Sequence, residues 1–512
     1  MKLGLSRRRP ARRRGRCPSF PILVLALLGA VRTAASAQEI PSGPDQLTLE
    51  DAIGLAREFN PDYRTQRSQL RQADIAISNA RGDLLPSLSI SNSYGYDAPG
   101  VRRAGSVVLG TQPDYYRSSY SLSFQYSLNG QSLLRPGQAR TQARAAEARV
   151  DGAGIALDAE VTDAYLRVLQ ADAQVLQARN ALERARLTVQ QAAAQVQVGA
   201  ATPLDLRRAE VQEGQAEVVL VESENQAAAS RASLSAVLGV MLPEDVALVT
   251  SFELFDPALD PDALLPLALD NNPVLRASRM GHEAAESGVT LAKSQFFPTI
   301  SLSAGITGSV FQAGDLDPLI NQAMTSQRGR FESCLEDNRI RQLLGDPPRD
   351  CAMLDPALPT VENDIREQVR LDNSGFPFGY RRQPLGISLN ISLPLFTGFS
   401  RTNQVESAQV AASNALEQVR AQELLLRTEL TTAARAVTTA RRTVELQARI
   451  RATAAEELRL AQERFALGLA SSIEVADAQA NLSQAERDEI NALYEFHRAV
   501  SALEALIGAP IR

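Results

Sequence analysis

The sequence predicts a membrane protein of the α plus transmembrane β class. We expect two tandem repeats in this chain, which give long coiled α-helical hairpins and four β-strands. Three observations support the prediction. The chain of 512 residues contains an internal duplication, long runs of helix-forming residues, and four short segments in which apolar and polar residues alternate. The duplication sets the architecture, because two copies of one unit are expected to form equivalent structures.

The duplication consists of two matched blocks. Residues 272–301 repeat residues 60–89 without a gap, at an offset of 212 (272 − 60). Further along, the segment around Gly468 repeats the segment around Gly199 at an offset of 269 (468 − 199). The 57 extra residues (269 − 212) must be an insertion between the blocks. The expected division is a first repeat at 38–240, a connecting segment at 241–271 and a second repeat at 272–512.

Residues 1–37 are expected to be an export signal that is removed from the mature chain. Basic residues from Arg7 to Arg16 precede an apolar run from Phe20 to Val31, and Ala35-Ser36-Ala37 offers small residues for cleavage. The alternative is a membrane anchor, but twelve apolar residues are too few to span a bilayer as a helix. Without the signal the chain has 44 basic and 59 acidic residues, a net charge of −15 (44 − 59), which argues against a nucleic-acid partner.

Each repeat is expected to contain one long helical hairpin. Residues 399–467 and 469–507 contain no proline or glycine and are rich in Ala, Gln, Glu, Arg and Leu, which favour helix. The first repeat has equivalent runs at 138–198 and 204–239. Helices of this length need partners along their whole length, and the many alanines allow close packing as in a coiled coil. The hairpin tips are expected at 199–203 and 468–472.

Four segments with a period of two are expected to be β-strands, because alternate side chains of a strand point to opposite faces. In the first segment Leu88 and Ile90 alternate with Ser89 and Ser91. Each segment is about ten residues long, the length of a tilted strand that crosses a membrane. An ordinary soluble sheet with one dry face is the alternative. The strands are expected at about 86–97, 118–130, 298–308 and 385–396.

Four strands cannot close a barrel. An open sheet edge in lipid leaves backbone groups without hydrogen bonds, at several kcal/mol each. Known barrels begin at about eight strands, so at least two chains are required, and three chains would give twelve strands.

The surplus residues fall in a long connection at about 311–383, which we expect on a surface. This loop holds Cys334 and Cys351, the two cysteines that follow the export signal. In an exported protein two such cysteines indicate one disulfide, and two unpaired thiols are the alternative.

Several motifs, taken together in their order and spacing, resemble the TolC-like outer-membrane efflux family. The opening Leu47-Thr48-Leu49-Glu50-Asp51-Ala52, followed by Asn60-Pro61, resembles the first helices of that family. The match covers essentially all of 47–508 outside the two strand-connecting loops. Leu84–Leu88 and Phe296–Ile300 resemble the family's two entries into the membrane strands. Pro394–Gly398 resembles its return from a strand to a long helix, and Val198–Ala200 and Leu467–Leu469 resemble its two hairpin tips.

The resemblance implies a homotrimer. Its twelve strands would form an outer-membrane β-barrel that continues as a periplasmic α-helical barrel. The loop at 311–383 would be extracellular, and the segment at 241–271 would lie at the equator of the helical barrel. The implied function is a passive exit duct of a tripartite efflux or type I secretion system. Its implied partners are a periplasmic adaptor protein, an inner-membrane transporter of the RND or ABC type, and outer-membrane lipid. A structural periplasmic coiled-coil protein, anchored in the outer membrane without transport, is the alternative.

We find no catalytic constellation in the sequence, and we expect neither an enzyme nor a cofactor. The two histidines, His282 and His497, fall on unrelated helices, whereas a zinc site needs several converging ligands. A phosphate-binding loop needs a lysine behind a glycine, and Lys293 has none before it. The energy for transport is therefore expected to come from a partner.

The resemblance implies a periplasmic gate at the hairpin tips. Carboxylates six and nine residues after the second tip glycine narrow the entrance in the family, and these positions are Glu474 and Asp477 here. Asp205 occupies the matching position after the first tip. In some members a basic residue two positions after the second tip glycine acts as a latch that helps to hold the entrance closed. Here that position is Ala470, and Arg208 or Arg464 could substitute. The alternative is that these acids only stabilise helix N-termini.

The hairpin tips are also candidates for docking the adaptor. A small exposed apolar tip suits a coiled-coil partner, whereas the alternative is that glycine only permits the turn. The tip residues are Val198, Gly199, Ala200, Leu467, Gly468 and Leu469.

Overall fold

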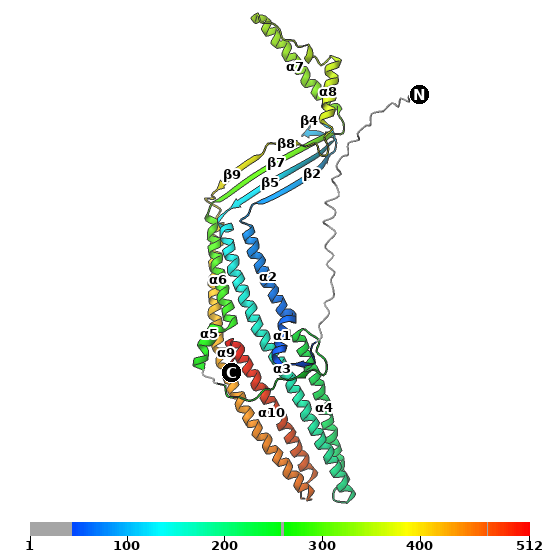
Figure 1. The fold of residues 1–512 in the computed structure, drawn as a ribbon, viewed down its shortest axis with the longest axis vertical. Coiled ribbons are helices and arrows are strands. Elements are labelled where there is room, and N and C mark those ends of the chain that lie inside the picture. Colours follow the sequence, from blue (N-terminus) through cyan, green and yellow to red (C-terminus); the bar gives the residue numbers. More distant parts are fainter. Residues whose placement is uncertain (1–42, 258–260, 468, 512) are drawn as a thin grey trace, which may run out of the picture.

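The structure is a computed structural model that describes residues 43–257, 261–467 and 469–511. The expected export signal at 1–37 and the tip residue Gly468 lie outside the described residues. The molecule is elongated, with a curved β-sheet towards one end and two helical hairpins that reach the other end (Figure 1).

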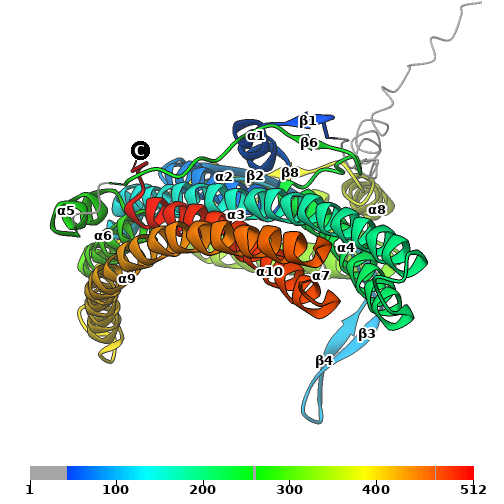
Figure 2. The same ribbon diagram turned by 90° about the horizontal axis from the view of Figure 1, so that it is seen from below.

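Long helices dominate the fold, and their bounds follow the expected hairpins closely. Seen from below, they form a curved wall, with α1 and α5 on its convex side (Figure 2). No helix among the described residues is both long and apolar enough to span a bilayer. The helices are α1 (Leu49–Phe59), α2 (Pro61–Gly82), α3 (Gly130–Gln197), α4 (Pro203–Leu238), α5 (Pro261–Asn271), α6 (Pro273–Lys293), α7 (Asp317–Leu344), α8 (Pro359–Asp372), α9 (Ser400–Ala466) and α10 (Ser472–Ile507).

The two repeats fold alike down to single hydrogen bonds. Asn60 caps α2 and Asn272 caps α6 with the same backbone conformation (φ −58° and −57°). In the first repeat the Asn60 amide also donates to the carbonyl oxygen of Val237, at 2.8 Å. In the second repeat the Asn272 amide donates to the carbonyl oxygen of Leu506, again at 2.8 Å. Each asparagine therefore ties the start of one helix to the end of a distant one.

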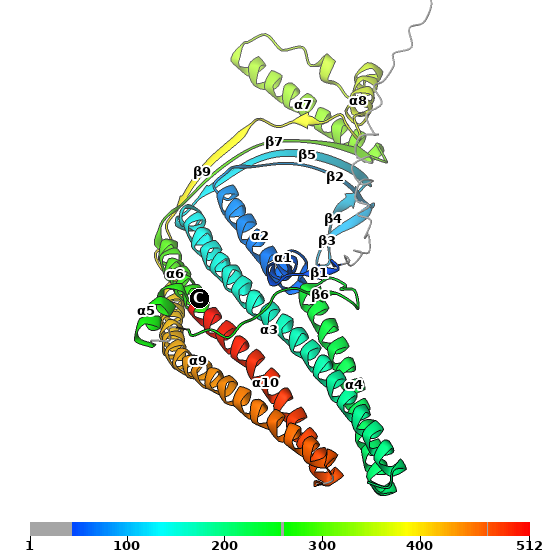
Figure 3. The same cartoon turned by 60° about the horizontal axis from the view of Figure 1, so that its bottom comes forward.

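The strands predicted to cross a membrane form one antiparallel sheet in the order β2-β5-β7, with β9 on the free edge of β7 (Figure 3). β5 begins at Tyr115, earlier than expected, because the ladder with β7 extends to the pair Tyr115–Ala313. β9 ends at Ser392, earlier than expected, since Pro394 has no N–H to donate. The strands are β2 (Ser87–Asp97), β5 (Tyr115–Leu128), β7 (Thr299–Ala313) and β9 (Gly386–Ser392), with the short β8 (Arg381–Arg382) beside β7.

One face of this sheet is lined with hydroxyl groups that bond across the strands. Ser91 and Ser121 lie 2.8 Å apart through their Oγ atoms, and Ser303 and Ser388 lie 2.7 Å apart. The same β2–β5 ladder contains the pairs Ser89–Ser123 and Ser93–Ser119. The other face exposes apolar side chains, such as Ile90 at 78%. A polar inner face and an apolar outer face are what a membrane barrel requires.

Both strand-connecting loops contain regular structure that the sequence analysis did not anticipate. The connection after β2 holds a second hairpin, β3 (Gly100–Ala104) and β4 (Val107–Gln112). The insertion at 311–383 holds α7 and α8. Cys334 and Cys351 form a disulfide there, which ties the middle of α7 to the segment before α8.

The connecting segment wraps the middle of the molecule. Its short strand β6 (Ala247–Leu248) pairs in parallel with β1 (Gln46–Leu47), so the start of the first repeat meets the link to the second. The buried hydroxyl of Tyr165 donates to the carbonyl oxygen of Leu47 at 2.8 Å and fixes this strand pair on α3. The main apolar cores lie here, beneath α1 and α5.

The glycines that end α4 and α10 generate a prediction about stability. Gly239 and Gly508 have φ of +73° and +75°, and a Cβ at either would lie within 2.6 Å of a carbonyl oxygen. We expect Gly508→Ala to destabilise the protein by about 2 kcal/mol or more, since both the backbone conformation and the space exclude a side chain. Thermal unfolding in detergent measures this. Gly214→Ala, in the open interior of α4, is the control, and an equal effect of the two variants would contradict the argument.

Candidate functional site

The two hairpin tips have the same local construction. Thr202 caps α4 and Ser471 caps α10, and each forms a reciprocal capping box with the acid three residues on, Asp205 and Glu474 respectively. Such a box satisfies backbone N–H groups that a helix start otherwise leaves free. Two of the three predicted gate acids therefore also stabilise helix starts, as the alternative interpretation expected.

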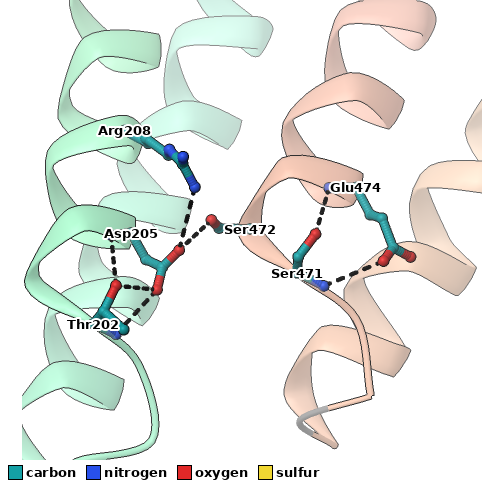
Figure 4. Close-up of polar contacts among 6 residues, drawn as sticks. All are labelled: Thr202, Asp205, Arg208, Ser471, Ser472 and Glu474. Atoms are coloured by element: carbon teal, nitrogen blue, oxygen red, sulfur yellow. Dashed lines mark hydrogen bonds and ion pairs between the residues drawn. The ribbon is translucent and has the colours of Figure 1, made fainter.

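Asp205 does more than cap its own helix. Its carboxylate accepts a hydrogen bond from the Ser472 hydroxyl at 2.6 Å, which joins the first hairpin to the second (Figure 4). The Thr202 hydroxyl and backbone N–H donate to the same carboxylate, at 2.7 and 3.0 Å. These bonds, first the one from Ser472, lower the pKa of Asp205 to about 2. The carboxylate is therefore ionised throughout the physiological range. We call this contact the Asp205–Ser472 clasp.

The other predicted tip residues are not part of the clasp. Glu474 pairs with Arg464 at 3.2 Å across its own hairpin, and Arg208 lies 4.0 Å from Asp205. Asp477 is exposed one turn further along α10 than Glu474. Both basic residues considered as substitutes for the latch thus contact a predicted gate acid within the same hairpin, and neither joins the two hairpins. Ser472 was missed by the sequence analysis.

The predicted docking tips are exposed and sharply turned. Gly199 has φ +76°, and Val198, beside it, is 79% exposed. In the second tip Leu467 and Leu469 are also strongly exposed, and the N–H of Leu469 closes the turn by donating to the carbonyl oxygen of Arg464 at 2.8 Å. Each tip therefore presents apolar side chains to solvent.

Above the clasp, α3 of the first hairpin meets α10 of the second through polar side chains. Arg184 pairs with Glu486 at 2.7 Å, and Gln479 donates to the Thr188 hydroxyl at 2.7 Å. By contrast, α9 and α10 within one hairpin pack through an apolar core that includes Leu458. Further contacts of this polar seam are Gln177 with Glu486 and with the carbonyl oxygen of Ser483, Gln170 and Gln174 with Asn491, and Arg498 with Gln170.

The contrast between core and seam has a mechanical consequence. Separating two apolar surfaces exposes them to water at about 25 cal/mol per Å². Exposed polar partners regain hydrogen bonds from water, so each pair contributes only about 1 kcal/mol net. The α9–α10 core of the second hairpin therefore holds more firmly than the seam. In the first hairpin α3 and α4 share an apolar core near α1, and ion pairs such as Arg179–Glu224 join them nearer the tip.

The comparison with family models matches the "Outer membrane efflux protein" family over residues 52–240 and 356–509. The chain belongs to the outer membrane efflux protein family. It is 23% identical over 493 residues to the outer membrane protein TolC of Vibrio cholerae serotype O1, covering 96% of this chain and 95% of that protein. It is 22% identical over 264 residues to the cobalt-zinc-cadmium resistance protein CzcC of Cupriavidus metallidurans, covering 52% of this chain but only 59% of that protein.

Solved structures share the fold. The channel CusC has a TM-score of 0.65 at 17% identity, covering 90% of this chain and 92% of its own. The outer membrane protein VceC of Vibrio cholerae has a TM-score of 0.63 at 20% identity, covering 91% and 97%. The predicted family and fold class are confirmed, since the chain combines long helical hairpins with a sheet of four long strands. The protein is an outer-membrane efflux channel that extends into the periplasm, and it is not an enzyme.

The lowered pKa of Asp205 generates a prediction about pH. Because the pKa of Asp205 is lower in the folded state, its ionised carboxylate stabilises the contact fully at pH values above the ordinary aspartate pKa of about 3.9. This contribution is lost only as the pH falls through about 2. The clasp should therefore hold from pH 7 to about 4. Spin labels on Val198→Cys and Leu469→Cys report the distance between the tips in detergent. We expect the distance distribution to stay unchanged over this range, and a distribution that already broadens between pH 6 and 4 would contradict the assignment.

Proposed function

We propose that this channel is the passive exit duct of a tripartite efflux or type I secretion system. A periplasmic adaptor would dock on it, and an inner-membrane pump of the RND or ABC type would supply the energy. The observation that carries the proposal is that two separate helical hairpins are joined to each other by the polar seam and the Asp205–Ser472 clasp. Such a joint suits an entrance that opens when a partner separates the hairpins.

In this proposal the clasp holds the periplasmic entrance closed. A charge-assisted hydrogen bond contributes about 1.5–3 kcal/mol in a sheltered site. Solvent at the exposed tip reduces that to about 1 kcal/mol. An adaptor that binds the separated hairpins better than the clasped ones would shift the equilibrium by its difference in affinity.

Conductance in planar bilayers tests both the duct and the clasp. Asp205→Ala and Ser472→Ala should each raise the open fraction about fivefold, and the double variant should add little, because one contact is lost in all three. Glu210→Ala is the matched control, since this acid pairs with Arg207 on the same helix and reaches no other hairpin. A protein that stays non-conducting in every variant would favour the alternative of a structural coiled-coil anchor.

The acids further inside the tips are proposed to form stacked rings in the trimer. Glu474 and Asp477 lie three residues apart on α10, and hence on one helix face. Rings of carboxylates favour cations. Replacing both with Gln and Asn should weaken block by divalent cations about tenfold in current recordings. Ser471→Ala disturbs the same helix cap without removing charge and should leave the block unchanged. Unaltered block by divalent cations in the double variant would show that these acids do not line the entrance.

The exposed tips are proposed to dock the adaptor. Val198→Asp with Leu469→Asp should lower co-purification of the adaptor about tenfold, because a charge replaces apolar contact at the centre of a small interface. Leu343→Asp, in an equally exposed leucine on α7 at the other end of the molecule, is the control. Equal recovery of the adaptor with all variants would place docking elsewhere.

A further inference from the structure

The hairpin β3–β4 is separate from the barrel sheet. It follows β2 and precedes β5, but its strands pair with each other in a sheet of their own. A Cβ built at Gly100 or Gly105 would meet no atom within 4 Å, and Val101 and Val107 are 51% and 60% exposed. Because an isolated two-stranded hairpin is marginally stable in water, this one requires a partner that the described part of a single chain does not supply.

Two prolines explain why the hairpin leaves the sheet. The barrel ladder ends at the pair Asp97–Tyr115, and pairing resumes only at Gly100–Gln112. Pro99 and Pro113 occupy the break, one on each strand. Proline has no N–H for the ladder and a fixed φ, so both strands are interrupted at the same level and the chain can bend.

The base of the hairpin is held in place at the rim. The N–H of Gly314 donates to the carbonyl oxygen of Asp114 at 3.2 Å, beside the last pair of the β5–β7 ladder. Arg117 on β5 forms an ion pair with Asp97 on β2 just below the bend. The bend is thus anchored to the barrel on both strands, which fixes where the hairpin starts.

The hairpin turns towards the concave side of the sheet. In Figure 2 it projects away from the curved wall on the side opposite α1 and α8, and in Figure 3 it lies beneath the arch of β2, β5, β7 and β9. When three chains close the barrel, the concave side of each sheet is the lumen. The hairpin therefore starts at the extracellular rim and points inwards.

The hairpin is long enough to reach the barrel axis. Twelve strands about 4.8 Å apart and tilted by about 40° give a circumference of about 75 Å and a radius of about 12 Å. β3 has five residues, which at about 3.4 Å each span about 17 Å. Three such hairpins cannot extend fully inwards without meeting.

We propose that the three β3–β4 hairpins contact one another in the lumen and form an outer constriction, which no single chain contains. This inference rests on the proposed exit duct and adds a second narrow point at its extracellular end. Arg103 is exposed on each hairpin, so the constriction is basic, opposite in sign to the acids at the periplasmic tips. A ring of guanidinium groups attracts anionic solutes and repels cations.

Cysteine cross-linking of the purified trimer tests the contact. Ser106→Cys places a thiol beside the turn, and the native cysteines are already bonded to each other. A disulfide forms only where two Cα atoms come within about 7 Å, so mild oxidation should convert about two thirds of the chains into a linked dimer. Asn363→Cys on α8, which lies towards the convex side, is the control and should give none. An intact trimer in which neither or both variants cross-link would overturn the proposal.

The prolines supply a second variant. Replacing Pro99 and Pro113 with Thr in the Ser106→Cys background restores two N–H groups and allows the ladder to continue straight. Cross-linking should then fall several-fold, and undiminished cross-linking would overturn the role given to the bend.

Conductance separates this proposal from that of the periplasmic clasp. In an Asp205→Ala channel, exchanging residues 100–112 for a two-residue turn should raise the conductance about twofold or more, since the hairpins occupy much of the lumen. An unchanged conductance would overturn the constriction. If Asp205→Ala alone has no effect, the clasp fails, while the cross-linking at Ser106 still decides whether the hairpins meet.

Discussion

The structure depends on one constraint, the hydrogen bonding of sheet edges within lipid. Each chain contributes the strand order β2-β5-β7-β9. Among the described residues, the outer edge of β2 has no partner along its eleven residues, and the outer edge of β9 has none along its seven. In hydrocarbon no water can satisfy those backbone groups, so an isolated chain would lose several kcal/mol at each one. In the closure that we infer, three chains would remove every edge by pairing β9 of one with β2 of the next. The closed lumen is a consequence of that pairing, and the export function uses it.

Duplication then determines how the channel can move. Each repeat carries its own helical hairpin, with equivalent caps at Thr202 and Ser471. An apolar core joins α9 to α10 along the second hairpin, and another joins α3 to α4 near α1. The two hairpins do not share one apolar core at this joint, because α3 of the first meets α10 of the second through glutamines, an asparagine and an ion pair. Because water can replace the polar contacts between α3 and α10, we expect the helical wall to open between these two helices. The Asp205–Ser472 clasp lies at the free end of such a joint, where a small separation has the largest effect on the entrance.

Much of this architecture is readable from the sequence, because the signals are local or periodic. The serine alternation in β2, the Asn-Pro starts of α2 and α6 and the duplicated tip glycines follow from strand, cap and turn chemistry. Ser472 was missed because its partner Asp205 lies 267 residues away, and only the lateral placement of two similar hairpins brings them together. The helices α7 and α8 were missed because the insertion has no copy in the first repeat and no apolar face extensive enough to mark a core. The hairpin β3–β4 was also missed. Pro99 and Pro113 mark its base in the sequence, but the direction in which it leaves the sheet depends on the curvature of the whole sheet.

Native mass spectrometry of the purified protein in detergent tests the central claim most directly, since it counts the chains that complete one barrel. The account predicts a single species with the mass of three chains, which persists until the detergent or heat also abolishes the β-sheet signal in circular dichroism. A monomer that keeps its full sheet signal in detergent would show that the four strands need no neighbours. That result would contradict the closure argument and, with it, the shared lumen.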